Sequence, residues 1–403
     1  MKIALVSEHA DPLAALGGAD AGGQNVHVAA LAAGLGREGH AVTVYTRRDT
    51  TGAPTTVQCE DGYVVRRITA GPPTDVPKDD LLQYMPAFGD RLGEHLRADP
   101  VDLVHAHFWM SGIAALRAAE GTPIPVLQTF HALGSVKRRE QGSADTSPSS
   151  RIDHERRLCR DVDHVVATCS DEIAELRKLG LPAGRASVIP CGVDTELFRP
   201  GARRDPDGPP RLLVIGRLVT RKGIGNTIEA LAQLPGVELV IAGGPRADAL
   251  GADPAVAGLR RLATRLGVAD RVRFVGSVAR VDVPPLIRDS DVVVTVPWYE
   301  PFGIVPLEAM ACGRPVVGTA VGGLLDTVVP GETGELLPPR RPDQLAETLR
   351  ALLDDPDRRT AYGRAARKRA VRLYDWDRVV QQTEDVYQAV AETFVRPTTE
   401  VIR

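Results

Sequence analysis

Residues 292–313 read VVVTVPWYEPFGIVPLEAMACG and contain a complete strand–loop–helix unit. The residues 292–296 are all β-branched, which is typical of a buried strand. An apolar segment of helical period then runs from 304 to 312. Pro306 falls in its first turn, where the missing N–H removes only a donor that has no partner within a helix. The stretch therefore places Glu300 in the loop after a strand and Glu308 inside the helix that follows.

The same alternation of short apolar strands and helices extends over the whole chain. We predict strands at 3–6, 42–45, 64–68, 101–105, 126–129, 164–167, 187–189, 212–215, 238–242, 272–275, 292–296 and 316–318. We predict helices at 25–38, 81–97, 112–119, 171–179, 224–233, 254–266, 304–312 and 342–353. Nearly continuous apolar strands separated by helices indicate parallel sheets covered on both faces. The predicted fold class is therefore α/β, with doubly wound, Rossmann-like sheets.

The segment 198–210, FRPGARRDPDGPP, interrupts this alternation with four prolines and two glycines. Such a composition is typical of a linker. A chain of 403 residues is also too long for one ordinary core. We therefore predict a first domain over 1–197, a second over 211–375, and a final helix over 376–403 that crosses back to the first domain. The carboxyl edges of two facing doubly wound sheets would enclose a ligand cleft.

The overall composition excludes several classes of protein. Hydrophobic residues make up 43% and charged residues 25%, as in an ordinary globular protein, and the net charge of −3 gives no basic excess for nucleic acid. The five cysteines form no CxxC pair, so we expect free thiols in a reducing, cytoplasmic compartment. No run of about 18 apolar residues could span a membrane, and the first residues indicate a strand rather than a signal peptide.

A glycine-rich loop, GGADAGGQN at 17–25, follows the first predicted strand. Glycines such as Gly22 and Gly23 allow the backbone to approach a ligand closely, and the helix that follows offers free N–H groups to an anion. The spacing does not match GxGxxG, which argues against an NAD-dependent dehydrogenase. A flexible loop with a helix cap at Asn25 is the alternative interpretation.

The loop after the first strand of the second domain, GRLVTRKG at 216–223, is basic. Arg217 and Lys222 are placed to form charge-assisted hydrogen bonds with a diphosphate at this edge of the sheet. A solvated basic turn is the alternative. At the same edge, the helix N-terminus near Gly303 favours an anion, and Glu308 stands in an apolar helix that should be buried.

Residues 297–313 resemble the E-x7-E signature of the retaining glycosyltransferases of family 4, which have the GT-B fold of two facing Rossmann-like domains. Other blocks resemble their counterparts in that family, in the same order: GGADAGGQNVHV, VDLVHAHFWMSG, TFHALG, SVIPCGVDTELFRP, GRLVTRKG and AVGGLLDTVVPGETGELL. GGADAGGQNVHV and HFWMSG are similar to the inositol-phosphate N-acetylglucosaminyltransferases of mycothiol synthesis. HALGSVK and RIDHE at 151–155 are similar to the sucrose-phosphate synthases.

The resemblance implies retaining transfer of a hexose or N-acetylhexosamine from a nucleotide diphosphate sugar to a small hydroxylated acceptor. His131 would bond the distal sugar hydroxyl, Arg217 and Lys222 would neutralise the leaving diphosphate, and Glu300 would hold sugar hydroxyls. The implied donor-binding residues are Gly22, Gly23, Arg217, Lys222, Glu300, Phe302, Gly303, Ile304, Val305 and Glu308, with the backbone near Ser277 and Val278 for the base. UDP is the favoured nucleotide, while GDP, ADP and dTDP stay open.

The resemblance also implies the acceptor-binding residues, which are Asn25, Lys78, Lys137 and Arg151. In both similar groups the acceptor carries a phosphate. However, Phe108 and Ala132 stand where the inositol-phosphate enzymes have Tyr and Thr, so two hydroxyls for the acceptor phosphate are missing. These departures argue against inositol phosphate itself and leave another phosphorylated acceptor open.

Three DxD sequences occur, at 161–163, 205–207 and 375–377. The metal-binding DxD belongs to a different transferase fold, so we interpret all three as structural and expect no metal and no cofactor beyond the co-substrate. The basic stretch 364–372 is interpreted as a solvated helix face rather than a membrane contact. Donor and acceptor are the expected partners of a monomer or homodimer.

Two other functions fit part of the pattern. A nucleotide-sugar 2-epimerase has two facing Rossmann-like domains and needs no acceptor, but the RKG and E-x7-E blocks argue against it. A non-catalytic nucleotide-sugar-binding protein would tolerate the loss of His131 or Glu300, and both are present. His105 and His107 end a predicted strand, where packing or hydrogen bonding is their expected role.

Overall fold

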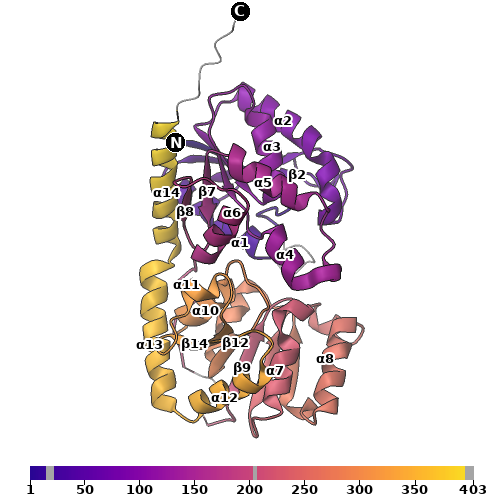
Figure 1. The fold of residues 1–403 in the computed structure, drawn as a ribbon, viewed down its shortest axis with the longest axis vertical. Helices are drawn as coiled ribbons and strands as arrows, with labels where there is room; N and C mark the ends of the chain where they lie inside the picture. The colour runs from indigo at the N-terminus through magenta and orange to yellow at the C-terminus, as the bar shows by residue number, and fades with distance from the viewer. Residues whose placement is uncertain (15–21, 203–206, 395–403) are drawn as a thin grey trace, which may run out of the picture.

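The structure is a computed structural model that describes residues 1–14, 22–202 and 207–394. It has two lobes, one above the other in Figure 1, and each lobe is built on a sheet flanked by helices. The first lobe is indigo to magenta and the second is magenta to orange. The α/β class predicted from the alternating pattern is therefore confirmed.

The sheet of the first lobe has eight strands in the described part of the chain, in the order β3-β4-β2-β1-β5-β6-β7-β8. All neighbours pair in parallel except β3 and β4, which are antiparallel at one edge. The strands are β1 (Lys2–Val6), β2 (Ala41–Arg47), β3 (Thr56–Gln58), β4 (Tyr63–Ile68), β5 (Leu103–His107), β6 (Val126–Thr129), β7 (His164–Ala167) and β8 (Ala186–Val188).

The sheet of the second lobe has six strands among the described residues, all parallel, in the order β11-β10-β9-β12-β13-β14. These strands are β9 (Arg211–Ile215), β10 (Glu238–Ala242), β11 (Val272–Gly276), β12 (Val292–Thr295), β13 (Val316–Thr319) and β14 (Gly334–Leu337). In both sheets the order of strands reverses at the first strand, since β1 lies between β2 and β5 and β9 lies between β10 and β12. This switch point is where parallel α/β sheets bind ligands.

Helices cover both sheets. Those of the first lobe are α1 (Gly23–Arg37), α2 (Met85–Ala98), α3 (Trp109–Ala119), α4 (Gly134–Gln141), α5 (Arg151–Asp161) and α6 (Ser170–Lys178). Those that follow are α7 (Ile224–Leu231), α8 (Pro254–Arg265), α9 (Val283–Arg288), α10 (Ile304–Ala311), α11 (Leu324–Thr327), α12 (Pro342–Leu353), α13 (Pro356–Leu373) and α14 (Trp376–Thr393). Short 3-10 turns that bear on the site are η1 (Lys78–Tyr84), η3 (Thr220–Lys222) and η6 (Arg280–Asp282).

Several element predictions need correction. The helix expected over 81–97 is two elements, η1 and α2, because Pro86 is compatible with a helix only in its first turn. The strand expected at 101–105 is β5, which runs on to His107. Helices α4 and α5 were not predicted, since their sequences GSVKRREQ and RIDHERRLCRD are so charged that an apolar period is hard to recognise. The short strands β3 and β14 were missed as well.

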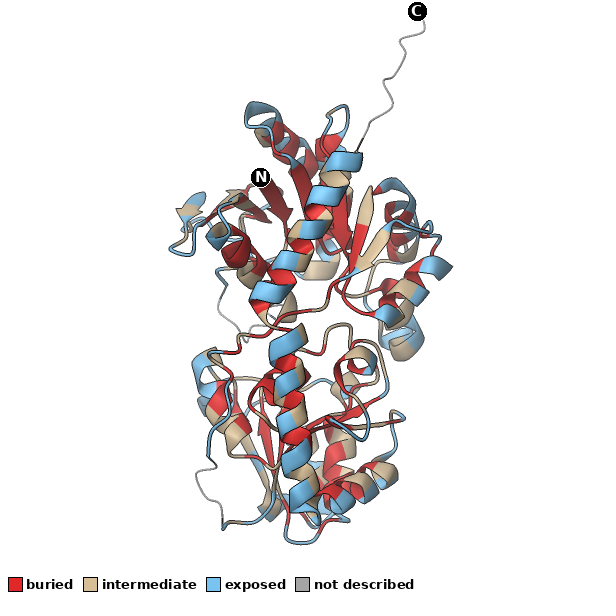
Figure 2. Cartoon of the chain, turned by 90° about the vertical axis from the view of Figure 1, so that its left-hand side faces the viewer, coloured by how far each residue is buried: buried red, intermediate tan, exposed pale blue. Residues whose placement is uncertain are grey.

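The last helix, α14, returns to the first lobe after α13 has followed the second, as Figure 2 shows along one side of the molecule. Val379 and Tyr387 of α14 are fully buried in the apolar core beneath the first sheet. Gly34 of α1 leaves room for Val380, with which an added Cβ would collide. Tyr387 Oη lies 2.6 Å from His105 Nδ1, so His105 has the hydrogen-bonding role expected of it.

The lobes also meet directly where their sheets face each other. Ser170 N, at the start of α6, donates to Asp326 Oδ2 of α11 at 2.6 Å. Thr168 Oγ1 lies 3.2 Å from the carbonyl oxygen of Pro301, and Gln141 Nε2 donates to Tyr299 Oη at 2.6 Å. These bonds place the loop that contains Glu300 against the carboxyl edge of the first sheet.

Candidate active site

Glu300 lies in the loop between β12 and α10. Its backbone carbonyl accepts a hydrogen bond from Gly323 N at 2.8 Å. Gly322 has a φ of 50°, and a Cβ at this position would collide with the same carbonyl. Only glycine therefore lets the segment before α11 support this loop so closely.

Lys222 forms an ion pair with Glu300, from Nζ to Oε2. It ends η3, and Gly223 behind it is pressed against the end of β12, since an added Cβ would collide with the carbonyl of Val296. Burial alone would raise the pKa of Glu300, but the charges of Lys222 and Arg221 outweigh burial and hold this pKa below its ordinary value. The pair is therefore charged at neutral pH, at the carboxyl ends of the neighbouring strands β9 and β12.

Arg217 is exposed in the same loop after β9. Its carbonyl accepts a hydrogen bond from Val219 N at 2.8 Å, which helps to fold the loop back toward η3. Helix α10 begins across this edge, because Gly303 precedes it in the left-handed conformation with φ of 75°. The first N–H groups of α10, from Ile304 and Val305, have no partner within the helix and can bind an anion.

His131 faces this loop from the first lobe. It has a φ of 62°, which is uncommon for a residue with a side chain, and its ring centroid lies 4.9 Å from that of Phe302. Its Nε2 lies 2.9 Å from Nδ1 of His107, and no described residue bonds its buried Nδ1. Burial is the main cause that holds the pKa of His131 well below its ordinary value, and the neighbouring histidines add to this effect. His131 is thus a neutral imidazole with one nitrogen unused by the described protein.

The turn at Gly22 and Gly23 closes the other side of the site. A Cβ on Gly23 would lie 3.2 Å from Ile304 Cδ1, so the two lobes nearly touch here. Asn25 Oδ1 accepts from Gly22 N at 3.0 Å, and its Nδ2 donates to the Asp11 carbonyl at 2.9 Å. The cap of α1 is therefore Gly22 rather than Asn25, and the Asn25 amide joins this cap to the segment of Asp11. Residues 15–21 of the glycine-rich loop lie outside the described residues.

Glu308 is buried in α10, with 5% of its surface exposed. Its Oε1 accepts a hydrogen bond from Arg280 Nη1 at 2.9 Å. Burial raises the pKa of Glu308 to about 7, although Arg280 opposes this rise. The bond brings α10 next to the segment of Ser277 and Val278, which follows β11. The residues expected to bind ribose and base are therefore neighbours.

The three cationic residues expected to bind the acceptor lie around α4 and the end of β5, and two of them already form ion pairs. Lys137 Nζ lies 3.0 Å from Asp145 Oδ1. Arg151 is buried, its Nε donates to Glu155 Oε1 at 2.8 Å, and its guanidinium lies over the Phe108 ring. Lys78 Nζ lies over the same ring, 5.5 Å from its centroid. The structure thus groups Lys78 and Arg151 around Phe108.

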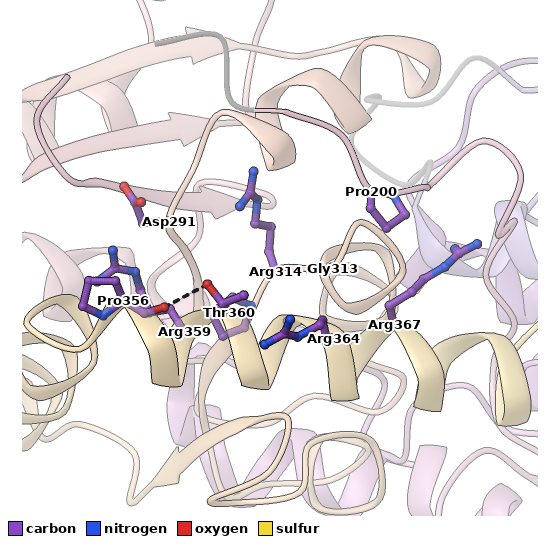
Figure 3. Close-up of a pocket in the computed structure, with 11 residues that line it drawn as sticks. Pro200, Asp291, Gly313, Arg314, Pro356, Arg359, Thr360, Arg364 and Arg367 are labelled. Carbon is purple, nitrogen blue, oxygen red and sulfur yellow. Dashed lines mark hydrogen bonds between the residues drawn. The ribbon is translucent and has the colours of Figure 1, made fainter. Parts of the chain in front are cut away.

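A hollow of about 380 Å³ lies elsewhere, along α13, and four arginines line it (Figure 3). It adjoins Asp291 and Pro315, which precede β12 and β13, so it is at the amino edge of the sheet, away from the loops described above. The arginine guanidinium groups do not converge in Figure 3. Arg367 Nη1 donates to the carbonyl of Phe198 at 2.9 Å, and Arg359 Nη1 to that of Leu352 at 3.1 Å. These arginines join backbone segments rather than forming a ligand site.

Two of the DxD carboxylates, Asp163 and Asp375, serve local structure. Asp163 Oδ2 accepts from Val126 N at 2.8 Å, and Asp375 caps α14 by accepting from Asp377 N at 3.0 Å. Asp205 lies outside the described residues. Within the described ranges, no three His, Cys, Asp or Glu side chains are placed to hold a metal ion, and no helix is both long and apolar enough to cross a bilayer.

Two residues of the site were not predicted. Arg280 was missed because its pairing with Glu308 depends on how β11 and α10 meet in the folded sheet. Arg221 could have been predicted, because it stands beside Lys222 in the basic loop GRLVTRKG. Its guanidinium lies 4.9 Å from the centroid of the Tyr299 ring, and its carbonyl accepts from Trp298 N at 2.8 Å. Arg221 therefore holds the Glu300 loop as well as lowering the pKa of that residue.

Comparison with known families places both halves of the chain. A family model described as Glycosyltransferase Family 4 matches residues 21–197, and one described as Glycosyl transferases group 1 matches residues 199–369. D-inositol 3-phosphate glycosyltransferase 2 of Catenulispora acidiphila is 36% identical, over 97% of this chain and 95% of that protein. The protein of the same name from Kineococcus radiotolerans is also 36% identical, over 97% of this chain and 96% of its own.

Solved structures show the same relationship. Sucrose-phosphate synthase from Thermosynechococcus elongatus superposes with a TM-score of 0.89 at 32% identity, over 96% of this chain and 98% of that one. Anabaena HepE, crystallised with UDP and glucose, superposes with a TM-score of 0.75 at 22% identity, over 96% of this chain and all of its own, which shows the shared fold. The chain is therefore a glycosyltransferase of family 4 with the GT-B fold.

Proposed function

We propose that this protein is a retaining glycosyltransferase that moves a hexose or N-acetylhexosamine from UDP to a small hydroxylated acceptor. The observation that carries the proposal is the charged Lys222–Glu300 pair, which lies at the switch point of the second sheet, in the loop whose Phe302 contacts His131 of the first lobe. The same residues stand at the positions that the family resemblance implies. UDP is the nucleotide that this resemblance favours.

The donor diphosphate would lie between the loop of Arg217 and Lys222 and the start of α10. Two cations and the free N–H groups of a helix terminus are suited to a diphosphate, and each charge-assisted hydrogen bond contributes about 1.5–3 kcal/mol. Glu308 would accept hydrogen bonds from the ribose hydroxyls. The unused Nδ1 of His131 would bond a sugar hydroxyl, which supports its assignment to the sugar.

The transfer would occur on one face of the sugar. The bond between the anomeric carbon and the diphosphate oxygen breaks, the acceptor oxygen bonds to the same face, and the departing phosphate takes the acceptor's proton. Lys222 and Arg217 would stabilise the negative charge that develops on the leaving group. Glu300 is held by Lys222 and would support the sugar hydroxyls rather than attack the anomeric carbon. These cations would make a metal ion unnecessary.

The acceptor would enter from the first lobe, near α4 and Phe108. A phosphate on it would meet Lys78, Lys137 and Arg151, of which Lys137 and Arg151 already have carboxylate partners. We infer a cytoplasmic site of action, where the five free thiols would stay reduced.

The test is a thermal-shift screen of UDP, GDP, ADP and dTDP, followed by NMR of the product formed from the sugar nucleotide that binds. We expect stabilisation by UDP above the other three, and about 2.7 kcal/mol when the ligand is at a hundred times its dissociation constant. The product should keep the anomeric configuration of the donor, with undiminished rates in EDTA. Inversion would refute retention, and binding by none of the four would refute the transferase itself. Conversion of the donor without any acceptor would favour the 2-epimerase.

A further inference from the structure

A second hollow, of about 200 Å³, lies between the lobes beside Glu300. The first lobe contributes α4 and the start of α6, and the second contributes residues 298–301 and 320–325. Ligand sites for drug-sized molecules measure about 300–1,000 Å³, so this pocket is sized for one sugar-like ring or part of one. Trp298, Tyr299, Val136 and Leu325 supply apolar walls.

The charge of this pocket is mostly negative. Its lining includes the carboxylates of Glu140, Asp171, Glu172, Glu175 and Glu300 against the single guanidinium of Arg139. Some of them are already neutralised, since Arg139 lies 3.3 Å from Glu140 and 3.1 Å from Glu175, and Lys222 pairs with Glu300. Asp171 and Glu172 form no ion pair with any residue in the described ranges. The carboxyl groups of the lining that have no ion-pair partner among the described residues are therefore both at the start of α6.

Glu172 is the unusual member. It is 7% exposed, and its Oε2 accepts hydrogen bonds from Thr168 N at 2.7 Å and Thr168 Oγ1 at 2.8 Å. Its other oxygen, Oε1, is buried and has no donor among the described residues. A buried carboxylate oxygen without a partner is costly. Burial accordingly raises the pKa of Glu172, and also that of Asp171, above the ordinary values. A bound cation would remove this cost.

The pocket is joined to the proposed reaction centre. Glu300 is in its wall, and the Thr168 hydroxyl, which donates to Glu172, also lies 3.2 Å from the carbonyl oxygen of Pro301. A ring in the pocket would therefore lie next to the residue assigned to the donor sugar. The cationic residues of α4 and α5 that could bind an acceptor phosphate, Lys137 and Arg151, instead have carboxylate partners within 3.0 Å.

We propose that the pocket binds a protonated amine of the acceptor, so that the acceptor is an amino sugar or an aminocyclitol. Asp171 and Glu172 hold the ammonium group, with Glu172 Oε1 accepting one of its hydrogen bonds. Trp298 and Tyr299 cover the apolar face of the ring. This assignment rests on the proposed transferase function, because it makes the pocket the acceptor end of that active site.

The experiment compares pairs of probes that differ by one amine. Isothermal titration of the UDP-bound protein is carried out with glucosamine against glucose, with scyllo-inosamine against scyllo-inositol, and with glucose 6-phosphate. We expect at least one amine to bind about tenfold or more tighter than its hydroxyl counterpart, the least that a charge-assisted hydrogen bond gives. Equal affinity within both pairs, or tightest binding of glucose 6-phosphate, would overturn the proposal.

Variants locate the preference. Glu172→Gln keeps an oxygen for Thr168 but removes the charge. Asp171→Asn removes the other charge, at a half-buried position where misfolding is not expected. Each should reduce the amine preference about tenfold, whereas Asp153→Asn, on exposed α5, should leave it unchanged. If Glu172→Gln does not fold, Asp171→Asn alone decides. A preference that survives in every folded variant would contradict the site.

Titration with UDP alone distinguishes a failure of the amine site from a failure of the proposed transferase function. Normal UDP binding without any amine preference would overturn the acceptor assignment and leave the proposed transferase intact. Absence of UDP binding would mean that the donor site is not formed, and the proposed function would fail with it.

Discussion

Glu300 and Glu308 belong to the same loop–helix unit and each is paired with a cation, yet their pKa values shift in opposite directions. Glu300 lies in the loop, and the charges of Lys222 and Arg221 overcome the effect of burial. Glu308 lies inside α10, and Arg280 does not overcome burial, so the pKa is raised to about 7. Two neighbouring carboxyl groups of one motif therefore ionise in different pH ranges.

The difference indicates how the two would divide the work. A carboxylate whose pKa is lowered by a paired lysine is suited to a fixed position beside the reacting sugar. A carboxyl group that titrates near neutral pH depends for its charge on what binds beside it. The number of nearby cations, rather than the degree of burial, makes the distinction. Removing a cation from either pair tests this explanation.

The largest effect is expected from Lys222→Ala. Without the ammonium, the pKa of Glu300 should rise because burial is then opposed mainly by Arg221. The leaving diphosphate would also lose a cation, and the loss of one such stabilising group lowers turnover by about 100- to 1,000-fold. Steady-state kinetics with the UDP-sugar should show this loss mainly in kcat, with a smaller change in KM.

Two controls accompany this measurement. Lys222→Arg keeps the positive charge and should recover part of the rate. Lys368→Ala removes a lysine from the exposed part of α13 and should have no effect. A rise in KM with unchanged kcat would show that Lys222 only binds the donor, and the explanation of Glu300 as a partner in the reaction would have to be abandoned.

The second prediction concerns stability and pH at Glu308. Its folded pKa of about 7 lies above the ordinary 4.5, so the folded protein holds a proton that the unfolded chain releases. The associated stability is fully present below about pH 4.5 and is lost as the pH rises through 7. A difference of this size corresponds to roughly 3 kcal/mol.

Glu308→Gln imitates the protonated side chain and isolates this contribution from other titrating groups. Urea unfolding of both proteins should give similar free energies near pH 5. Near pH 8, the Gln variant should be the more stable by a few kcal/mol. If the difference between the two proteins is the same at both pH values, Glu308 has an ordinary pKa and its contrast with Glu300 disappears.

The sequence was sufficient for the features that depend on local pattern. The strand–loop–helix unit around Glu300, most of the parallel strands and the placement of His131 at a strand end all follow from apolar periods and from glycine and proline positions. The helix α2 was placed too early because the effect of Pro86 was overlooked. The charged helices α4 and α5, which contain Lys137 and Arg151, could not be recognised by a search for apolar periods.

Contacts between distant segments could not be read from the sequence. The bond between Arg280 and Glu308 requires the η6 turn to lie against α10, and the bond between His107 and His131 requires β5 and β6 to be neighbours. Asn25 is a further example, since its residue type suits both a ligand contact and a helix cap, and the structure places its amide one turn inside α1, where it accepts from Gly22 N. Tertiary contacts decide the charge and the role of such residues.

The smallest effect is expected on the pH dependence of nucleotide binding. Ribose hydroxyls donate hydrogen bonds to a carboxylate, so the affinity for UDP should rise as Glu308 ionises, with a midpoint near its pKa of about 7. Arg280 favours the ionised form, and Arg280→Ala should therefore move the midpoint upward and weaken binding several-fold at pH 7, whereas Arg280→Lys should restore most of it. Isothermal titration with UDP from pH 6 to 8.5 measures both quantities. A midpoint that Arg280→Ala leaves in place would show that the pair with Arg280 does not control the charge of Glu308. The contrast between the two carboxylates would then have to arise from burial alone. Burial raises the pKa of both groups, so it cannot explain why the pKa of Glu300 is lowered.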